Sequence, residues 1–143
     1  MNIKIYGDGA DINEMINAYN EGIVSGFTTN PTLMKKSGIT DYLGFAKDAL
    51  SEIRDMPISF EVFSDDINEM EVQAFKLRDL GENVYVKIPV TNTKGLPTYQ
   101  LINKLTQNNV KVNVTAIFTK SQIEEVARNI VNETPSVISI FAG

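Results

Sequence analysis

Residues 84–90 read VYVKIPV, and their side chains alternate along an extended chain. Val84, Val86 and Ile88 share one face of the expected strand, whereas Tyr85 and Lys87 point to the other. Strands of a doubly wound parallel sheet are covered by helices on both faces and are almost continuously apolar. The alternation therefore indicates a strand with one face on an apolar core and the other on a polar interior.

The same alternation recurs in residues 58–63, 110–116 and 137–140. In each segment a polar side chain opposes the apolar face, and the four polar residues are spaced 26 residues apart: Glu61, Lys87, Asn113 and Ser139. We expect each of them at an equivalent point of its strand, around one shared interior. The pattern also places Ala116 on the apolar face, with Val110, Val112 and Val114.

Segments with β character begin near six residues: Ile3, Val24, Ile58, Val84, Val110 and Val137. Helical periodicity separates most of them, at residues 11–19, 41–54, 67–77, 96–105 and 119–131, and Thr119 with Gln122 is typical of a capping box. Strands alternating with helices predict a parallel sheet. With a polar interior, the fold class is α/β, a TIM-type (β/α)8 barrel of which about six βα units are present.

The composition narrows the class of protein. With 143 residues, 43% hydrophobic and 22% charged, the chain is expected to form one domain, residues 1–143. A net charge of −5 argues against nucleic acid as a partner, and no stretch has the length of a membrane span or the apolar core of a signal peptide. The chain contains no cysteine, so it cannot form disulfides and does not require an oxidising compartment. We therefore expect a cytoplasmic protein.

Lys87 is the first candidate for chemistry. A single strand lysine is commonly a solvent-facing edge residue, but VYVKIPV is typical of a central strand. Partial desolvation there would favour the neutral amine. A neutral amine can attack a ketone and form an iminium, which accepts electrons when a carbon–carbon bond breaks. This is the chemistry of a class I aldolase, and the absence of histidine leaves its proton transfers to other groups.

Two carboxylates, Asp8 and Glu61, end the first and third expected strands and could move those protons. The alternatives are that Asp8 is a turn residue in YGDGAD and that Glu61 is a buried ion-pair partner of Lys87. A dinucleotide-binding loop at Gly7 and Gly9 is rejected, because Ile12 occupies the third glycine position of that motif.

Four motifs resemble those of the transaldolase family, which includes the small transaldolases and fructose-6-phosphate aldolase. They are GFTTNPTL at 26–33, YVKIPVT at 85–91, NVTAIFT at 113–119 and SIFAG at 139–143. The resemblance runs from the first strand to the last residue, and it rests on the order and spacing of the motifs. It implies six of the units of a class I aldolase barrel, with Lys87 as the Schiff-base lysine.

The resemblance also implies roles for individual residues. Asp8 would accept the proton of the substrate C4 hydroxyl, and Glu61 with Thr115 would hold a catalytic water. The expected substrate-binding residues are Thr28, Asn30, Asn113, Ser139 and Phe141. Purely structural roles are the alternatives for three of these residues. Thr28 and Asn30 could cap the turn before Pro31, and Phe141 could pack in the core.

The implied reaction transfers a dihydroxyacetone unit from sedoheptulose 7-phosphate or fructose 6-phosphate to an aldose phosphate, as in the pentose phosphate pathway, without cofactor or metal. Two alternatives stay open: a fructose-6-phosphate aldolase, which typically has glutamine at position 61 and tyrosine at 141, and a non-catalytic sugar-phosphate binding protein. The sequence stops before the arginine that usually follows SIFAG and before two further units. We therefore expect a fragment, and a homo-oligomer is left open.

Overall fold

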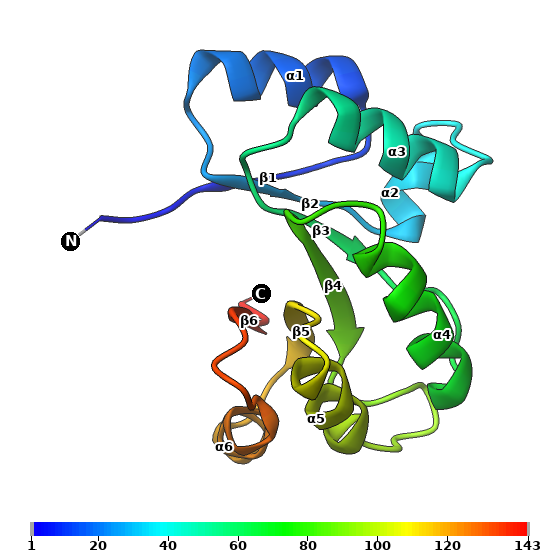
Figure 1. The fold of residues 1–143 in the computed structure, drawn as a ribbon, viewed down its shortest axis with the longest axis vertical. Helices are drawn as coiled ribbons and strands as arrows, with labels where there is room; N and C mark the ends of the chain where they lie inside the picture. The colour runs from blue at the N-terminus through cyan, green and yellow to red at the C-terminus, as the bar shows by residue number, and fades with distance from the viewer. Residues whose placement is uncertain (1, 143) are drawn as a thin grey trace.

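The computed structural model describes residues 2–142 and contains one sheet of six parallel strands (Figure 1). The strands are β1 Tyr6–Asp8, β2 Gly26–Thr28, β3 Ile58–Glu61, β4 Val84–Pro89, β5 Val112–Ile117 and β6 Ser136–Ile140. They lie side by side in the order of the sequence. A doubly wound sheet reverses its strand order at a switch point. The unreversed order and the curvature therefore confirm a partial TIM-type barrel of about six βα units.

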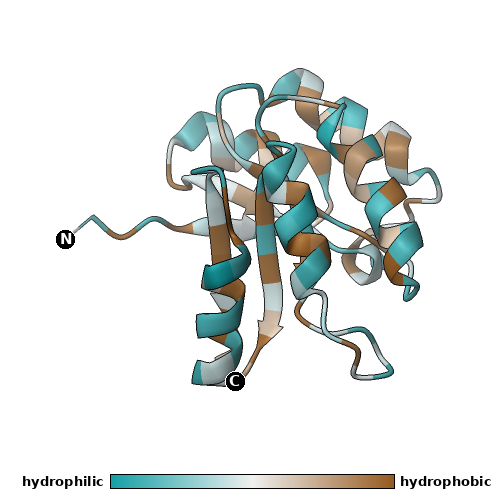
Figure 2. Cartoon of the chain, turned by 60° about the horizontal axis from the view of Figure 1, so that its bottom comes forward, coloured by the Kyte–Doolittle hydropathy of each residue, from teal (hydrophilic) through white to brown (hydrophobic). Residues whose placement is uncertain are grey.

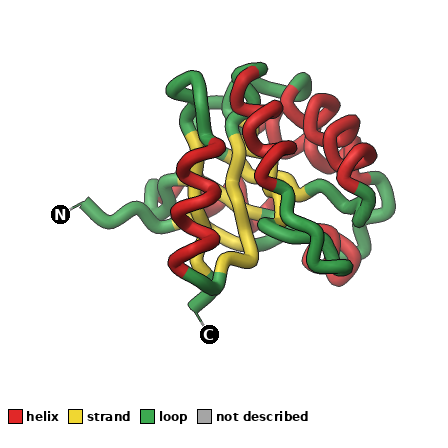
Figure 3. Tube along the Cα trace, turned by 90° about the horizontal axis from the view of Figure 1, so that it is seen from below, coloured by secondary structure: helices red, strands yellow, loops and turns green. Residues whose placement is uncertain are grey.

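Helices alternate with the strands and lie on the convex side of the curved sheet (Figures 1 and 3). They are α1 Ile12–Glu21, α2 Pro31–Lys36, α3 Tyr42–Glu52, α4 Ile67–Arg78, α5 Tyr99–Gln107 and α6 Lys120–Asn129. The sheet therefore has one face against the helix layer and one face toward the interior of the half-barrel. This division explains the alternation of side chains that the strands show.

Side-chain caps fix where five of these helices begin. The capping residues accept a hydrogen bond from a backbone N–H of the first turn, and they are Asp11, Asn30, Asp41, Asp66 and Thr119. The capping box of Thr119 with Gln122 is confirmed. Helix α2 was not predicted, because its six residues are too short to show a helical period. Its start is encoded locally, by the Asn30 cap and by Pro31 in the first turn.

The apolar core fills the space between the sheet and the helices. Along β4, buried and half-buried residues alternate as predicted, with Val86 and Ile88 fully buried. Helix α5 presents Ile102 and Leu105 to the same core. Hydropathy correspondingly varies in bands along strands and helices (Figure 2).

A β-bulge in β5 corrects the predicted position of Ala116. The ladder with β6 is regular to Val114–Ile138 and resumes at Ile117–Ile140, so β5 contains one extra residue. Ala116 takes up that residue with a left-handed φ of 58° and is exposed, and Ile117 is buried in its place. The prediction that Ala116 lies on the apolar face was wrong, because a bulge shifts the phase of every residue after it.

The first strand begins later than predicted. Ile3 is 78% exposed and lies outside β1, which starts at Tyr6. Pairing with β2 is limited to the three residues of that short strand, extended by a hydrogen bond from Ser25 N to Ile5 O. Among the described residues, Asn2, Ile3 and Lys4 therefore lie outside this pairing.

We expect Ala116→Gly to leave the free energy of unfolding unchanged or slightly increased. Relief of a left-handed alanine gains about 1–2 kcal/mol, and the added freedom of the unfolded chain costs about 0.4–1 kcal/mol. The matched control is Ala127→Gly, at an exposed position inside α6, which should cost about 1 kcal/mol. Urea unfolding of both variants measures the difference. Equal losses in the two would contradict the strained bulge.

Candidate active site

The register of the central strands places Lys87 between two polar neighbours. Glu61 of β3 pairs with Lys87 of β4, and Lys87 pairs with Asn113 of β5. Residues in register on parallel strands project from the same face, so the three side chains form one row on the interior of the half-barrel. The 26-residue spacing thus predicted this row correctly.

Ser139 does not continue the row at the same height. Asn113 pairs with Val137, so Ser139 lies two residues further along β6, on the same face. Its hydroxyl nevertheless donates a hydrogen bond to Asn113 Oδ1 at 2.7 Å. The offset arises because register partners on β5 and β6 are only 24 residues apart, as Asn113 and Val137 show, whereas those on β3, β4 and β5 are 26 residues apart. Ser139 is therefore joined to the row by a hydrogen bond to Asn113 but is not in register with it.

Lys87 lies in the interior and not at an edge of the sheet. It is half-buried on β4, which has β3 and β5 as neighbours, so the alternative of a solvent-facing edge lysine was wrong. Its Nζ donates to the backbone oxygen of Thr29 at 3.4 Å. None of the ion pairs found among residues 2–142 contains Lys87 or Glu61, so the alternative of a simple ion pair between them has no support.

Two carboxylates on the interior face of the sheet, Asp8 and Glu61, have different surroundings. Asp8, on β1, is exposed and accepts a hydrogen bond from the Thr28 hydroxyl at 2.7 Å, which fixes the orientation of its carboxylate. Glu61 is half-buried, and burial raises the pKa of its carboxyl group. The charge of Lys87 partly opposes that rise, and the charge of Asp8 adds to it. Glu61 can therefore hold a proton at a higher pH than an ordinary glutamate.

A chain of hydrogen bonds orients Asn113, which is almost fully buried. Its Oδ1 accepts from Ser139 and its Nδ2 donates to Ser59 Oγ at 3.2 Å, with the amide orientation assigned from these partners. Ser59 was not predicted as a site residue. Its signal in the sequence was its position two residues before Glu61, on the same strand face.

Asn30 has a structural role at the edge of the site. Its Oδ1 accepts from Leu33 N at 2.9 Å, which confirms that it caps the turn before α2. It also lines an open hollow over the ends of β2, β3 and β4, together with Glu61.

Two loops that line the same hollow are joined by Asp65 and Thr93. Asp65 accepts hydrogen bonds from the backbone N–H and the hydroxyl of Thr93, at 2.8 and 2.7 Å. These bonds lower the pKa of Asp65.

Thr115 and Phe141 complete the predicted set. Thr115 is half-buried on β5, in register with Pro89 of β4 and on the same face as Asn113. Phe141 is 65% exposed just after β6, and its ring centroid lies 5.4 Å from that of the exposed Phe118. The alternative of Phe141 as core packing was therefore wrong.

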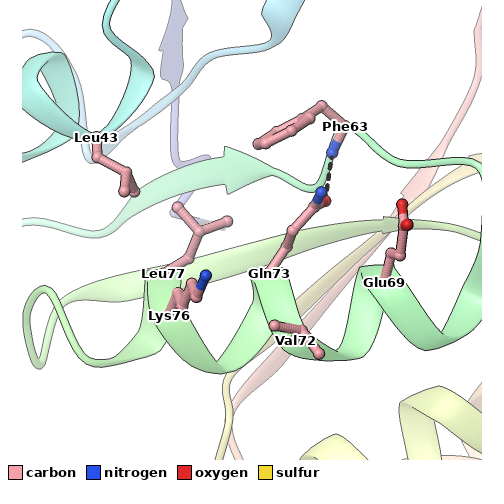
Figure 4. Close-up of a pocket in the computed structure, with 7 residues that line it drawn as sticks. All are labelled: Leu43, Phe63, Glu69, Val72, Gln73, Lys76 and Leu77. Atoms are coloured by element: carbon pink, nitrogen blue, oxygen red, sulfur yellow. Dashed lines mark hydrogen bonds between the residues drawn. The ribbon is translucent and has the colours of Figure 1, made fainter.

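A second hollow, between α3 and α4, belongs to the helix layer (Figure 4). Its mostly apolar lining comes from Leu43, Phe63, Glu69, Val72, Gln73, Lys76 and Leu77, and it includes none of the predicted site residues. Among residues 2–142 no cluster of three acidic side chains could hold a metal ion. No helix in the same range has the length and apolar character needed to cross a membrane.

An amine and two unequal carboxylates on one interior face can support a defined chemistry. The amine can act as a nucleophile toward a carbonyl, and a carboxylate with a raised pKa can exchange protons with the intermediate. The second carboxylate, that of Asp8, is oriented by the Thr28 hydroxyl. The arrangement is suited to imine formation followed by bond cleavage.

Sequence comparisons show which known proteins the chain resembles. A sequence model described as transaldolase/fructose-6-phosphate aldolase matches residues 5–143. A probable transaldolase of Thermoanaerobacter sp. (strain X514) is 39% identical over 126 residues, which are 88% of this chain and 56% of the relative. One of Thermoplasma volcanium is 40% identical over 122 residues, 84% of this chain and 52% of the relative. The chain thus spans about half the length of the curated relatives it matches.

We expect Glu61→Gln to stabilise the fold at neutral pH. A raised pKa means that the folded state binds the proton more tightly than the unfolded state, so the stability associated with Glu61 is present at low pH and is lost as pH rises through the folded pKa. Glutamine removes that loss. Urea unfolding between pH 4 and 7 should show an advantage of the variant that shrinks as pH falls, and an advantage independent of pH would contradict the raised pKa.

Proposed function

Because the chain belongs to the transaldolase/fructose-6-phosphate aldolase family, we propose that Lys87 forms a Schiff base with a ketose phosphate and that the complete protein transfers a dihydroxyacetone unit. One observation carries the proposal: the Lys87 amine lies on a central strand, in register with Glu61 and Asn113. A half-buried lysine without an ion-pair partner among residues 2–142 is available as a nucleophile.

The first step is the addition of the neutral Lys87 amine to the C2 carbonyl carbon. The carbinolamine that forms loses its hydroxyl as water and becomes a protonated imine. Glu61, together with a water also held by Thr115, would supply and remove the protons of this step. The raised pKa of Glu61 supports this role, because a shift of a carboxyl pKa upward, in the direction of neutral pH, makes the group a better proton donor and acceptor there.

The second step breaks the bond between C3 and C4. Asp8 accepts the proton of the C4 hydroxyl, the bond electrons flow into the protonated imine, and an aldose phosphate leaves an enamine on Lys87. The hydrogen bond from Thr28 supports this role, since it orients the Asp8 carboxylate toward the interior face that Thr28 shares. Addition of the enamine to a second aldose phosphate reverses the proton movements, and hydrolysis of the imine releases the product.

The substrate would lie along the carboxyl ends of β1 to β6. Asn113 and Asn30 are proposed to bind substrate hydroxyls, Ser139 to help place the phosphate-bearing end, and Phe141 to line the pocket. The hydrogen bonds that orient Asn113 support its role, because a preoriented amide discriminates between hydroxyl positions. The exposure of Phe141 leaves its ring available to a ligand.

The proposed donors are sedoheptulose 7-phosphate and fructose 6-phosphate, with the reaction in the cytoplasm as part of the pentose phosphate pathway. Fructose-6-phosphate aldolase is the second candidate, because the family description includes it. A carboxylate at Glu61 and a ring without a hydroxyl at Phe141 favour transfer over release of the enamine as dihydroxyacetone. The ratio of transferred product to free dihydroxyacetone distinguishes the two.

We expect borohydride to trap a three-carbon adduct on Lys87 when the full-length protein is incubated with fructose 6-phosphate. Peptide mass mapping locates the adduct. Lys87→Met should abolish both adduct and turnover. The matched control is Lys111→Met, because Lys111 donates to Glu82 O at 2.8 Å beside the ring of Tyr85, at the opposite end of the strands. An adduct that survives Lys87→Met, or no adduct in the parent protein, would refute the Schiff base.

Asp8→Asn should separate imine formation from cleavage. The amide keeps the shape and can still pair with Thr28, but it cannot accept the C4 proton. We expect turnover to fall by about 100-fold or more, while the yield of trapped imine at Lys87 stays within about threefold. Turnover and the yield of trapped imine are measured in the same preparation. Parallel losses of both would assign Asp8 a structural role.

A further inference from the structure

The hydrogen-bond ladder between β2 and β3 stops one donor short of Glu61. Phe27 N donates to Pro57 O at 2.8 Å, and Thr29 N donates to Ser59 O at 3.1 Å. In a parallel ladder the next donor on the same side is two residues further on, opposite Glu61 O. That residue is Pro31, which has no N–H. The carbonyl of Glu61 therefore needs a donor from outside the sheet.

Tyr42, the first residue of α3, supplies that donor. Its hydroxyl donates to Glu61 O at 2.6 Å. Its ring packs edge-on against Phe60, with 6.4 Å between centroids, and at 5.5 Å against Phe63. Burial, and then the nearby charge of Glu61, raise the pKa of Tyr42, so its hydroxyl stays protonated and remains a donor at neutral pH. One side chain thus contacts residues before, at and after Glu61.

The residues that follow Glu61 are held by other elements. Val62 N donates to Lys87 O at 3.2 Å. Gln73 of α4 accepts from Phe63 N at 3.0 Å (Figure 4) and also from Ser64 N at 3.1 Å. The segment is therefore fixed on its β4 and α4 sides without Tyr42. On the β2 side, where Pro31 leaves the gap, Tyr42 is the donor at Glu61 O.

We propose that Tyr42 is a positioning residue for Glu61: its hydroxyl takes the place of the missing ladder donor and holds the end of β3 so that the Glu61 carboxylate faces Lys87. The proposal rests on the proposed function, in which Glu61 exchanges protons with the intermediate on Lys87. The groups that affect the titration of Glu61 are Lys87 from β4 and Asp8 from β1, and Tyr42 lies against it from α3.

The test is Tyr42→Phe in the full-length protein, which removes one oxygen atom and keeps the ring between Phe60 and Phe63. With Glu61 O unpaired, water should reach the strand end, and the pKa of the Glu61 carboxyl should fall toward its ordinary value. Carbon-13 NMR of the glutamate carboxyl groups measures that pKa. We also expect kcat to fall by about threefold to tenfold, with KM within about twofold, because the proton transfers are affected more than binding.

Tyr19→Phe is the matched control. Tyr19 of α1 also donates its hydroxyl to a residue outside its helix, Asp55, but it does not contact the strand end. The control should change neither the pKa of Glu61 nor kcat, although both variants lose one hydrogen bond and their urea stabilities can be compared.

An unchanged pKa of Glu61 in Tyr42→Phe, or an equal change in both variants, would overturn the positioning role. The NMR titration does not depend on turnover. A parent protein that forms no imine at Lys87 would refute the proposed function, and the titration would still decide whether Tyr42 positions Glu61.

Discussion

The pairing of β3, β4 and β5 in register is the constraint on which the site depends. It places Glu61, Lys87 and Asn113 in one row, on a face that the helices leave uncovered. On the opposite face, Val86 and Ile88 are fully buried against the helix layer. A shift of one residue in any of these strands would exchange the two faces, so the burial of the apolar face keeps the amine in the interior. Packing of the apolar face thus stabilises the register that the proposed chemistry requires.

The ends of the strand ladders give the site its polar environment. Where the β2–β3 ladder stops, two backbone carbonyls lack strand donors and take side-chain donors in their place. Thr29 O accepts from the Lys87 amine, and Glu61 O accepts from the Tyr42 hydroxyl. Buried carbonyl groups need partners, so each bond both satisfies the backbone and fixes a side chain that is important for the chemistry. The absence of an N–H at Pro31 creates the second of these openings.

Irregular backbone lies close to the functional residues. The bulge at Ala116 follows Thr115 directly and turns the end of β5, while Asn30 ends β2 by capping α2. Bulges and tight strand-to-helix turns are common beside active sites, because they redirect side chains that a regular strand would place differently. Such features lie in a frame whose six strands keep the sequence order, so the irregularities change the site without changing the fold.

The sequence by itself determined the fold class, the row of Glu61, Lys87 and Asn113, and the helix cap at Thr119, because each depends on a periodicity or a regular spacing of residue types along the chain. It did not determine the exposure of Ala116 or the offset of Ser139, which follow from a bulge and from a different spacing of register partners between β5 and β6. The contacts of Thr29, Ser59 and Tyr42 with site residues were also decided only by the tertiary structure. They join residues from 19 to 58 positions apart, through a strand curvature that no local pattern contains.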